Sequence, residues 1–193
     1  MNRKGLWIVP LVAAFAAVGC NADGSAAEPA PTAAPATVVT TPLAYDDGQP
    51  IVARTSDPAA LAGESCLEAL INNHRALVGL APLVVMAEAK DLARGHSINM
   101  ATQVPGFFDH CNPQGDLPSN RAEKAAVAFL AVGENLAAGH PTPSQVFQAW
   151  LQSPGHRANL ENPRWTHMGV GQAYEPSSLY GAYWTLTLFE RTE

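Results

Sequence analysis

The stretch that decides the fold is AYWTLTLFE at residues 182–190. It alternates with a period of two, which is typical of a β-strand. One face carries Trp184, Leu186 and Leu188, and the other carries threonines between two aromatic rings. A strand that is apolar enough to be covered on both faces is usually central in its sheet. We therefore predict a central strand that lies between two layers of helices.

Working outward from this strand, the sequence predicts helices first and a hairpin last. Residues 168–174 form a second predicted strand, and a turn-rich link at residues 175–178 joins it to the first. Helical spacing is present over residues 65–78, 87–101 and 121–129, and in a stretch that begins at Thr142 and ends at Ser153. Ser65 with Glu68, and Thr142 with Gln145, have the spacing of a capping box at a helix start. This order of elements favours an α+β domain.

Residues 1–20 have the features of a signal peptide. Arg3 and Lys4 precede an apolar run that is too short to span a membrane, and Gly19-Cys20 follows it. A small residue before a cysteine at this place resembles a bacterial lipoprotein cleavage site, after which the thiol of Cys20 would carry lipid. Ordinary secretion, with cleavage at a nearby alanine or glycine, is the alternative. Both readings place the mature protein outside the cytoplasm, and the first anchors it to the bacterial cell envelope.

The next segment, residues 21–63, shows neither helical nor strand periodicity. Prolines punctuate an Ala/Thr-rich run that contains little apolar surface to bury, so its ordering entropy would not be offset. We interpret this segment as a disordered tether. The remaining residues, 64–193, are enough for one compact core.

The charge balance excludes one large class of partners. Eleven basic and seventeen acidic side chains give a formal net charge of −6. A nucleic-acid binder would need a basic face to replace the counterions along the phosphates. Removal of the signal peptide takes away Arg3 and Lys4 and makes the charge −8. We therefore expect the lipid, rather than electrostatic adhesion, to be the protein's link to the membrane.

The chain has three cysteines, an odd number that requires an explanation. If Cys20 carries lipid, Cys66 and Cys111 remain. In an oxidising compartment these two would most simply form one disulfide. Two buried thiols are the alternative, and the sequence leaves both open.

Several segments, in this order along residues 65–190, resemble a bacterial CAP domain, the superfamily of cysteine-rich secretory proteins, antigen 5 and plant pathogenesis-related proteins. They are residues 70–72 with Arg75, Gly79, Pro82-Leu83, Asp109-His110, the run GENLAAG at 133–139, the run WLQSPGHRANL at 150–160, and MGVG at 168–171. The resemblance implies a three-layer α/β/α sandwich with a mainly antiparallel central sheet. It also implies a cleft with two histidines and two glutamates. His110, Glu134 and His156 match three of these positions, whereas Ser153 stands where the second glutamate is usual.

The three matching residues suit two kinds of chemistry. Two imidazoles and a carboxylate are a ligand set for a divalent cation such as Zn²⁺, with an open position for water. Without a metal, either histidine could serve as a general base that Glu134 orients. Neither Ser153 nor Cys111 is a convincing nucleophile from its sequence position. His74 and His96 lie on helix stripes that face the core, where structural histidines are usual. A purely structural role, in which Glu134 accepts hydrogen bonds within the sheet and the two histidines orient loops, is the alternative that we place just behind metal or ligand binding and ahead of catalysis.

Three hypotheses follow. The leading one is a cleft that binds a lipid, another small molecule, cell-wall material or a protein partner. The second is a metal-dependent hydrolase that acts on peptides or an envelope polymer. The third is a structural or interaction module whose cleft has no function. The family spans unrelated activities, so the fold alone cannot choose among them.

Overall fold

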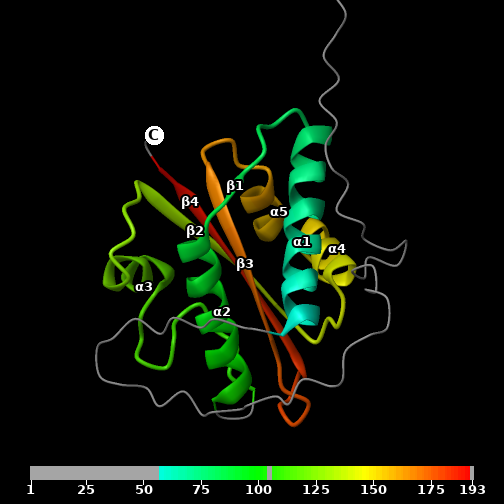
Figure 1. The fold of residues 1–193 in the computed structure, drawn as a ribbon, viewed down its shortest axis with the longest axis vertical. Coiled ribbons are helices and arrows are strands. Elements are labelled where there is room, and N and C mark those ends of the chain that lie inside the picture. The colour runs from blue at the N-terminus through cyan, green and yellow to red at the C-terminus, as the bar shows by residue number, and fades with distance from the viewer. Residues whose placement is uncertain (1–56, 104–105, 192–193) are drawn as a thin grey trace, which may run out of the picture.

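The computed structural model describes residues 57–103 and 106–191 (Figure 1). The described chain contains helices and strands in an order that begins with helices and ends with a hairpin. They are α1 (Pro58–Leu77), β1 (Val84–Val85), α2 (Ala87–Thr102), α3 (Pro118–Lys124), β2 (Ala131–Ala138), α4 (Pro143–Gln152), α5 (Pro154–Leu160), β3 (His167–Tyr174) and β4 (Ala182–Glu190).

The four strands form one mixed sheet in the order β1-β3-β4-β2. Strand β4 lies between β3 and β2 and is antiparallel to both, whereas the short β1 runs parallel to β3. Eight of the nine residues of β4 are buried. The prediction that this strand is central is therefore confirmed. The order also leaves β2 at one edge of the sheet, where it can position side chains beside solvent.

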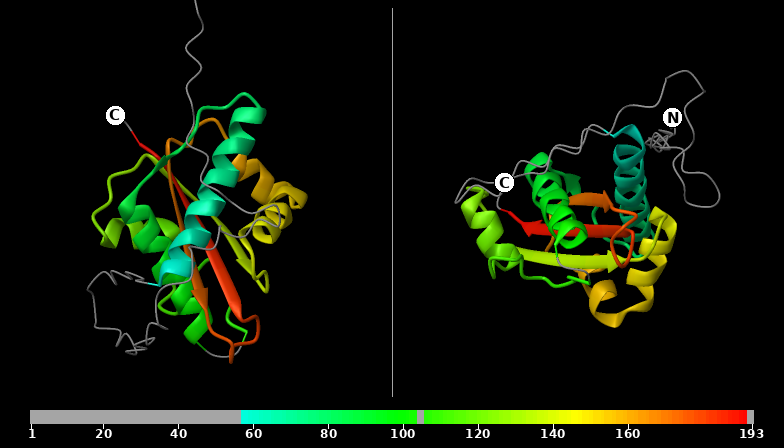
Figure 2. Two further views of the ribbon diagram at one scale, coloured as in Figure 1. Left: turned by 45° about the vertical axis from the view of Figure 1, so that its right-hand side comes forward. Right: turned by 90° about the horizontal axis from the view of Figure 1, so that it is seen from below.

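Helices cover both faces of the sheet, as the right-hand view of Figure 2 shows from below, with α2 and α3 on the left and α1, α4 and α5 on the right. The even-numbered residues of β4, such as Trp184 and Leu186, pack with α1 and α4. Phe189, on the other face, packs with Ala89 of α2 and Ala122 of α3. The α+β domain is thus a three-layer α/β/α sandwich, as expected.

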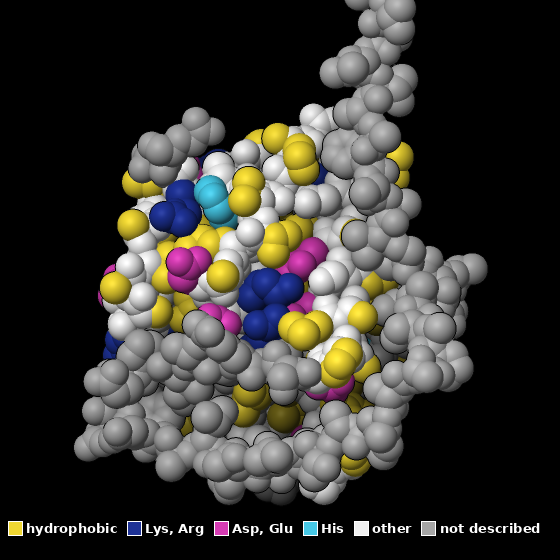
Figure 3. All heavy atoms as spheres, in the orientation of Figure 1, with side chains coloured by type: hydrophobic (Ala, Val, Ile, Leu, Met, Phe, Trp, Pro, Cys, Tyr) yellow, Lys and Arg dark blue, Asp and Glu magenta, His cyan; other side chains and the backbone are white. Residues whose placement is uncertain are grey.

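Two acidic side chains of α1 close the outer edge of β3. Glu68 Oε1 accepts from the backbone N–H of Val170, and Glu64 Oε1 accepts from that of Gln172, each at 3.2 Å. Arg94 of α2 donates to Glu64 from its Nε at 2.8 Å. Figure 3 shows acidic and basic side chains side by side at the middle of this face. Since edge N–H groups would otherwise lack partners, these pairs fix α1 and α2 on the sheet.

The first helix begins earlier than predicted, at Pro58 rather than at Ser65. Its N-cap is Asp57, whose side chain accepts from the backbone N–H of Ala59 at 3.0 Å. Ser65 instead lies inside the helix and donates to the carbonyl of Leu61. The C-terminal boundary of the predicted tether, at residue 63, is therefore wrong. The rest of residues 21–63 and the predicted signal peptide lie outside the described residues.

The third helix also differs from its prediction, since it covers Pro118–Lys124 rather than residues 121–129. The helix that begins after Thr142 is confirmed, with both hydrogen bonds of its capping box present. Strands β1 and β2 and helix α5 were not predicted from periodicity. Two of these, β2 and α5, carry Glu134 and His156.

The predicted disulfide between Cys66 and Cys111 is wrong, because Cys111 has a free thiol. Cys66 is buried in α1, on one side of the sheet. Cys111 follows His110, whose contacts are to Arg121 of α3 and to β2 on the other side. The sheet separates the two cysteines. Over residues 57–103 and 106–191, no helix has the length and apolar character that a membrane span requires.

Candidate functional site

The candidate site lies at the open edge of β2, where the side chain of Glu134 is held from two directions. Its Oε1 is 2.8 Å from Nδ1 of His110, and its Oε2 accepts from the guanidinium of Arg121 in α3. The carboxylate is 2% exposed, while the His110 side chain is 50% exposed. A buried carboxylate therefore fixes an imidazole that solvent can reach.

Arg121 also fixes the segment that carries His110. Its Nη1 donates to the carbonyl of His110 at 2.7 Å and to that of Asp116 at 2.9 Å. One guanidinium thus binds Glu134 and two backbone carbonyls of the segment between α2 and α3. Its planar array of five donors suits this use.

His96 of α2 contacts the backbone of the segment between α2 and α3 that carries His110. Its Nε2 lies 2.8 Å from the carbonyl of Asp109, so that nitrogen carries the proton and donates. The same Nε2 is 3.9 Å from Glu134 Oε1. The His96 side chain is buried, as predicted for a histidine on the core-facing stripe of its helix.

The second imidazole of the site comes from the other helix layer. His156 lies in α5, and its backbone carbonyl accepts from the Asn135 side chain at 3.0 Å. Asn159, also in α5, donates to the carbonyl of Glu134 at 3.2 Å and to Asn135 Oδ1 at 2.8 Å. These amides attach α5 to β2, so His110 and His156 approach the same strand edge from opposite faces of the sheet.

The three histidines differ in their protonation behaviour. The hydrogen bond to Glu134 raises the pKa of His110, against the effect of burial. Burial lowers the pKa of His156, and the nearby His110 adds to this effect. Burial also lowers the pKa of His96, to about 4. At neutral pH the site therefore contains neutral His96 and His156, beside a His110 that holds its proton more strongly than an ordinary histidine.

These directions predict an order of titration. We expect His110 to lose its proton above the ordinary histidine pKa of about 6.5, His156 below it, and His96 only near pH 4. The His110–Glu134 contribution to stability is then present below pH 6.5 and is lost as the pH rises through the raised pKa. The His96 contribution is lost as the pH falls from 6.5 towards 4. Imidazole shifts in an NMR titration measure the order, and a His110 that titrates below His156 would contradict it.

The expected zinc ligand set does not fit this geometry. Both oxygens of Glu134 are engaged, and one of them faces the permanent positive charge of Arg121. Among the residues that the structure describes, no group of three or more His, Cys, Asp and Glu side chains is arranged to hold a metal ion. A divalent cation at Glu134 would have to displace the guanidinium. We therefore derive no chemical step through a metal.

The site also offers no activated nucleophile. Ser153, which stands where the family usually has a second glutamate, lies between α4 and α5. Within the described part of the chain, neither its hydroxyl nor the thiol of Cys111 hydrogen-bonds to His110 or His156. Nucleophilic catalysis requires a base within such reach of the nucleophile. The arrangement favours binding through two imidazoles over covalent catalysis.

Sequence reasoning brought together His110 and Glu134 and expected Asn159 to hydrogen-bond to backbone, which it does, but it missed Arg121 and Asn135. No spacing rule selects an arginine in the last turn of a short helix as the partner of a glutamate on a separate strand. Asn135 and Asn159 belong to the runs GENLAAG and WLQSPGHRANL, which carried the family resemblance. The family resemblance of these two runs was therefore the feature of the sequence that could have indicated the contact between the two asparagines.

Comparison with known proteins agrees with this fold. The model of the cysteine-rich secretory protein family, CAP, matches residues 68–188. The chain is 36% identical over 132 residues to the protein YkwD of Bacillus subtilis (strain 168), covering 68% of this chain and 49% of that one. It is 34% identical over 102 residues to the membrane protein YlbC of the same organism, covering 53% of this chain and 29% of the relative. The chain thus spans about half or less of the length of these relatives.

Solved structures show the same similarity. An extracellular protein with an SCP domain from Bacillus anthracis str. Ames has a TM-score of 0.61 at 29% identity, covering 69% of this chain and 42% of that one. An outer surface protein of Borrelia burgdorferi has a TM-score of 0.60 at 22% identity, covering 66% and 92% respectively. Since the family model matches well over half of the chain, this protein belongs to the cysteine-rich secretory protein (CAP) family.

Proposed function

We propose that this CAP-domain protein is anchored by lipid outside the cytoplasm and binds a small ligand through the cleft of His110, Glu134 and His156. The observation that carries the proposal is the His110 imidazole, half exposed yet held by a buried carboxylate. Its Nδ1 is engaged with Glu134, so Nε2 is the nitrogen that remains for a ligand. In the protonated ring Nε2 carries an N–H that can donate to a ligand, and in the neutral ring it is an acceptor, because the single proton is then on Nδ1. A ring fixed in this way is preorganised for binding.

The charges of His110, Glu134 and Arg121 indicate the chemistry of the proposed ligand. Arg121 offsets the charge of Glu134, so protonation of His110 leaves the three groups with a net positive charge. His156 adds a largely neutral imidazole beside them. This set favours a hydrogen-bond acceptor or an anionic group, such as the carboxylate of a fatty acid or a phosphate, over a cation.

The proposed location draws on two observations. A structural relative at 29% identity is described as an extracellular protein. The N-terminal sequence, with Cys20 after its apolar run, has the pattern of a lipoprotein signal. Lipid on Cys20 would hold the domain at the surface of the cell envelope.

Binding is tested by calorimetric titration of the purified protein with hexanoate and with inorganic phosphate. We expect one of these probes to bind, and the double variant His110→Ala/His156→Ala to lower its affinity about tenfold or more, because charge-assisted hydrogen bonds are lost. His140→Ala is the matched control, since this histidine lines a separate pocket beside α4. Equal affinity in the double variant, or no binding of either probe by the native protein, would remove the cleft from the function.

Anchoring is tested by Cys20→Ala in cells. We expect the native protein in the membrane fraction and the variant in the soluble extracytoplasmic fraction, because one thiol carries the whole lipid attachment. Fractionation with an antibody to the domain measures this. A variant that stays in the membrane fraction to the same extent as the native protein would contradict the anchor.

A further inference from the structure

An apolar run, ALVGLAPLVVMA at residues 76–87, lies where α1 ends and α2 begins, and it contains no polar or charged side chain. Four of its aliphatic side chains are exposed, Leu77 by 86%, Val84 by 58%, Val78 by 45% and Val85 by 44%. Single exposed apolar residues are ordinary, but a group of them along one run marks a contact surface. These four residues are called the aliphatic patch below.

Hydrogen bonds hold the apolar run on the last turns of α1. Asn72 Oδ1 accepts from the backbone N–H of Leu83 at 2.8 Å, and its Nδ2 donates to the carbonyl of the same residue at 3.0 Å. The buried Arg75 donates from Nε to the carbonyl of Ala81 at 2.8 Å. Gly79, with a φ of +80°, makes the turn between them, a conformation that favours glycine. The aliphatic patch is therefore presented by a fixed turn.

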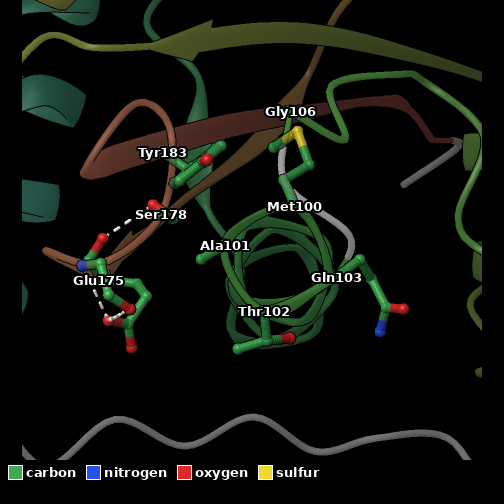
Figure 4. A pocket seen from close by; sticks show the side chains of 9 residues that line it. Met100, Ala101, Thr102, Gln103, Gly106, Glu175, Ser178 and Tyr183 are labelled. Atoms are coloured by element: carbon green, nitrogen blue, oxygen red, sulfur yellow. Dashed lines mark hydrogen bonds between the residues drawn. The ribbon is translucent and has the colours of Figure 1, made fainter.

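The patch lies at one end of the domain, and the opposite end is polar. Strand β1 pairs with the first residues of β3, Val84 with His167, so the patch is at the end of the sheet where β3 begins. The other end of β3 leads into the β3–β4 hairpin, where Figure 4 shows Glu175 and Ser178 beside Ala101 of α2. Figure 1 shows β1 and the end of α1 at the top of the domain and this hairpin at the bottom. The domain thus has one apolar end and one end that carries a carboxylate.

We propose that the aliphatic patch inserts into the surface of the membrane to which lipid would hold Cys20, so this contact depends on the anchor proposed above. Helix α1 carries the patch about 30 Å from Asp57, where the predicted tether ends. A flexible chain of the length of residues 21–56 has an end-to-end distance of roughly 30–36 Å. The tether can therefore reach from the anchor along α1 to Asp57 while the patch faces the bilayer. Because the domain is tethered, even a weak contact acts at high effective concentration.

The chemistry of the patch favours lipid over a protein partner or a second copy of this chain. The residues that dominate protein interfaces are Trp, Tyr and Arg, and residues 76–87 include none of them. The run also has no side chain that could form a hydrogen bond to a partner, and a bilayer interior requires none. After removal of the signal peptide the formal charge is −8, so attraction to anionic headgroups cannot drive the contact. Burial of aliphatic side chains is the remaining driving force.

The test is flotation of the unlipidated chain, residues 21–193, with phosphatidylcholine vesicles. This chain keeps every residue that the structure describes. We expect it to float with the vesicles, and to do so equally at low and high salt, because hydrophobic contacts are not screened. Leu77→Asp and Val84→Asp should each lower the vesicle affinity about tenfold or more, because a charge would have to enter the apolar region. No lipid is on the chain, so failure here is distinguishable from failure of the Cys20 anchor, which cell fractionation measures.

Leu179→Asp is the matched control for the patch. Leu179 is also an exposed leucine, by 64%, but it belongs to the hairpin at the polar end of the domain. Its replacement should leave flotation unchanged. Thermal melts check that the variants fold, and Leu77→Ser decides if an aspartate variant does not. Sedimentation velocity should show a monomer. No flotation of the native chain, flotation that salt abolishes, equal loss in the Leu179 control, or a dimer that Leu77→Asp dissociates would each overturn the proposal.

Discussion

Replacement of Gly171 by alanine is expected to cost about 3 kcal/mol of the free energy of unfolding, because the new methyl group would meet the backbone of α2. A Cβ built at this position lies 2.1 Å from the backbone nitrogen of Arg94 and 2.4 Å from the backbone carbon of Ala93. Real contacts of this kind are never so short, and a helix backbone cannot rotate away as a side chain can. Helix α2 would therefore have to move off β3, taking His96 and Arg94 with it.

Urea denaturation of the purified protein measures this loss. Gly155→Ala is the matched control, because no atom lies within 4 Å of the Cβ that it adds and the position is inside α5. There alanine should be neutral or should stabilise by up to about 1 kcal/mol. Equal stability of the two variants would show that α2 does not pack on β3 as closely as described.

The second large effect is expected from Arg121→Ala. This change removes the one arginine that pairs with the buried carboxylate of Glu134 among the described residues, and breaking such a buried pair costs about 3–5 kcal/mol. It also frees the carbonyls of His110 and Asp116. We therefore expect both a less stable domain and a disordered His110.

Arg164→Ala is the control for Arg121→Ala, since Arg164 also pairs with a glutamate, Glu190, but is 65% exposed. Exposed ion pairs contribute about 0–1 kcal/mol. Urea denaturation curves at neutral pH compare the free energies of unfolding of the two variants. If Arg121→Ala lowered the free energy of unfolding by no more than Arg164→Ala at neutral pH, the Arg121 guanidinium would not be what stabilises the buried Glu134 carboxylate.

The sequence predicted those elements whose signals are local. The alternation in residues 182–190 reflects burial on both faces, and β4 is indeed central. Thr142 and Pro143 begin α4 because the cap, the fixed φ of proline and the returning Gln145 all act within one turn. The Ser65 start was wrong because Glu68, its supposed capping partner, binds the edge of β3 instead. That contact joins residues 102 positions apart, which no local pattern contains.

The candidate site also depends on contacts between residues that are far apart in the sequence, which local patterns do not contain. Strand β2 has little alternation in its run of small residues, and its pairing with β4 is a tertiary event. The meeting of His110 and Glu134 was expected only from the family resemblance. The position of Arg121 follows from how α3 packs beside β2, which depends on the whole sheet. This residue changes the chemistry expected of the site, because it supplies the positive charge for which a metal was considered.

Arg121 places a permanent positive charge on Glu134, and we propose that His110 and His156 bind their ligand without a metal. The most direct measurement is the imidazole ¹H–¹⁵N NMR spectrum of the purified protein during a zinc titration at neutral pH. We predict that one equivalent of Zn²⁺ leaves the His110 and His156 signals in place, and that Arg121→Gln makes them respond. Stoichiometric zinc binding by the native protein, with a shift of both imidazole signals, would contradict this account.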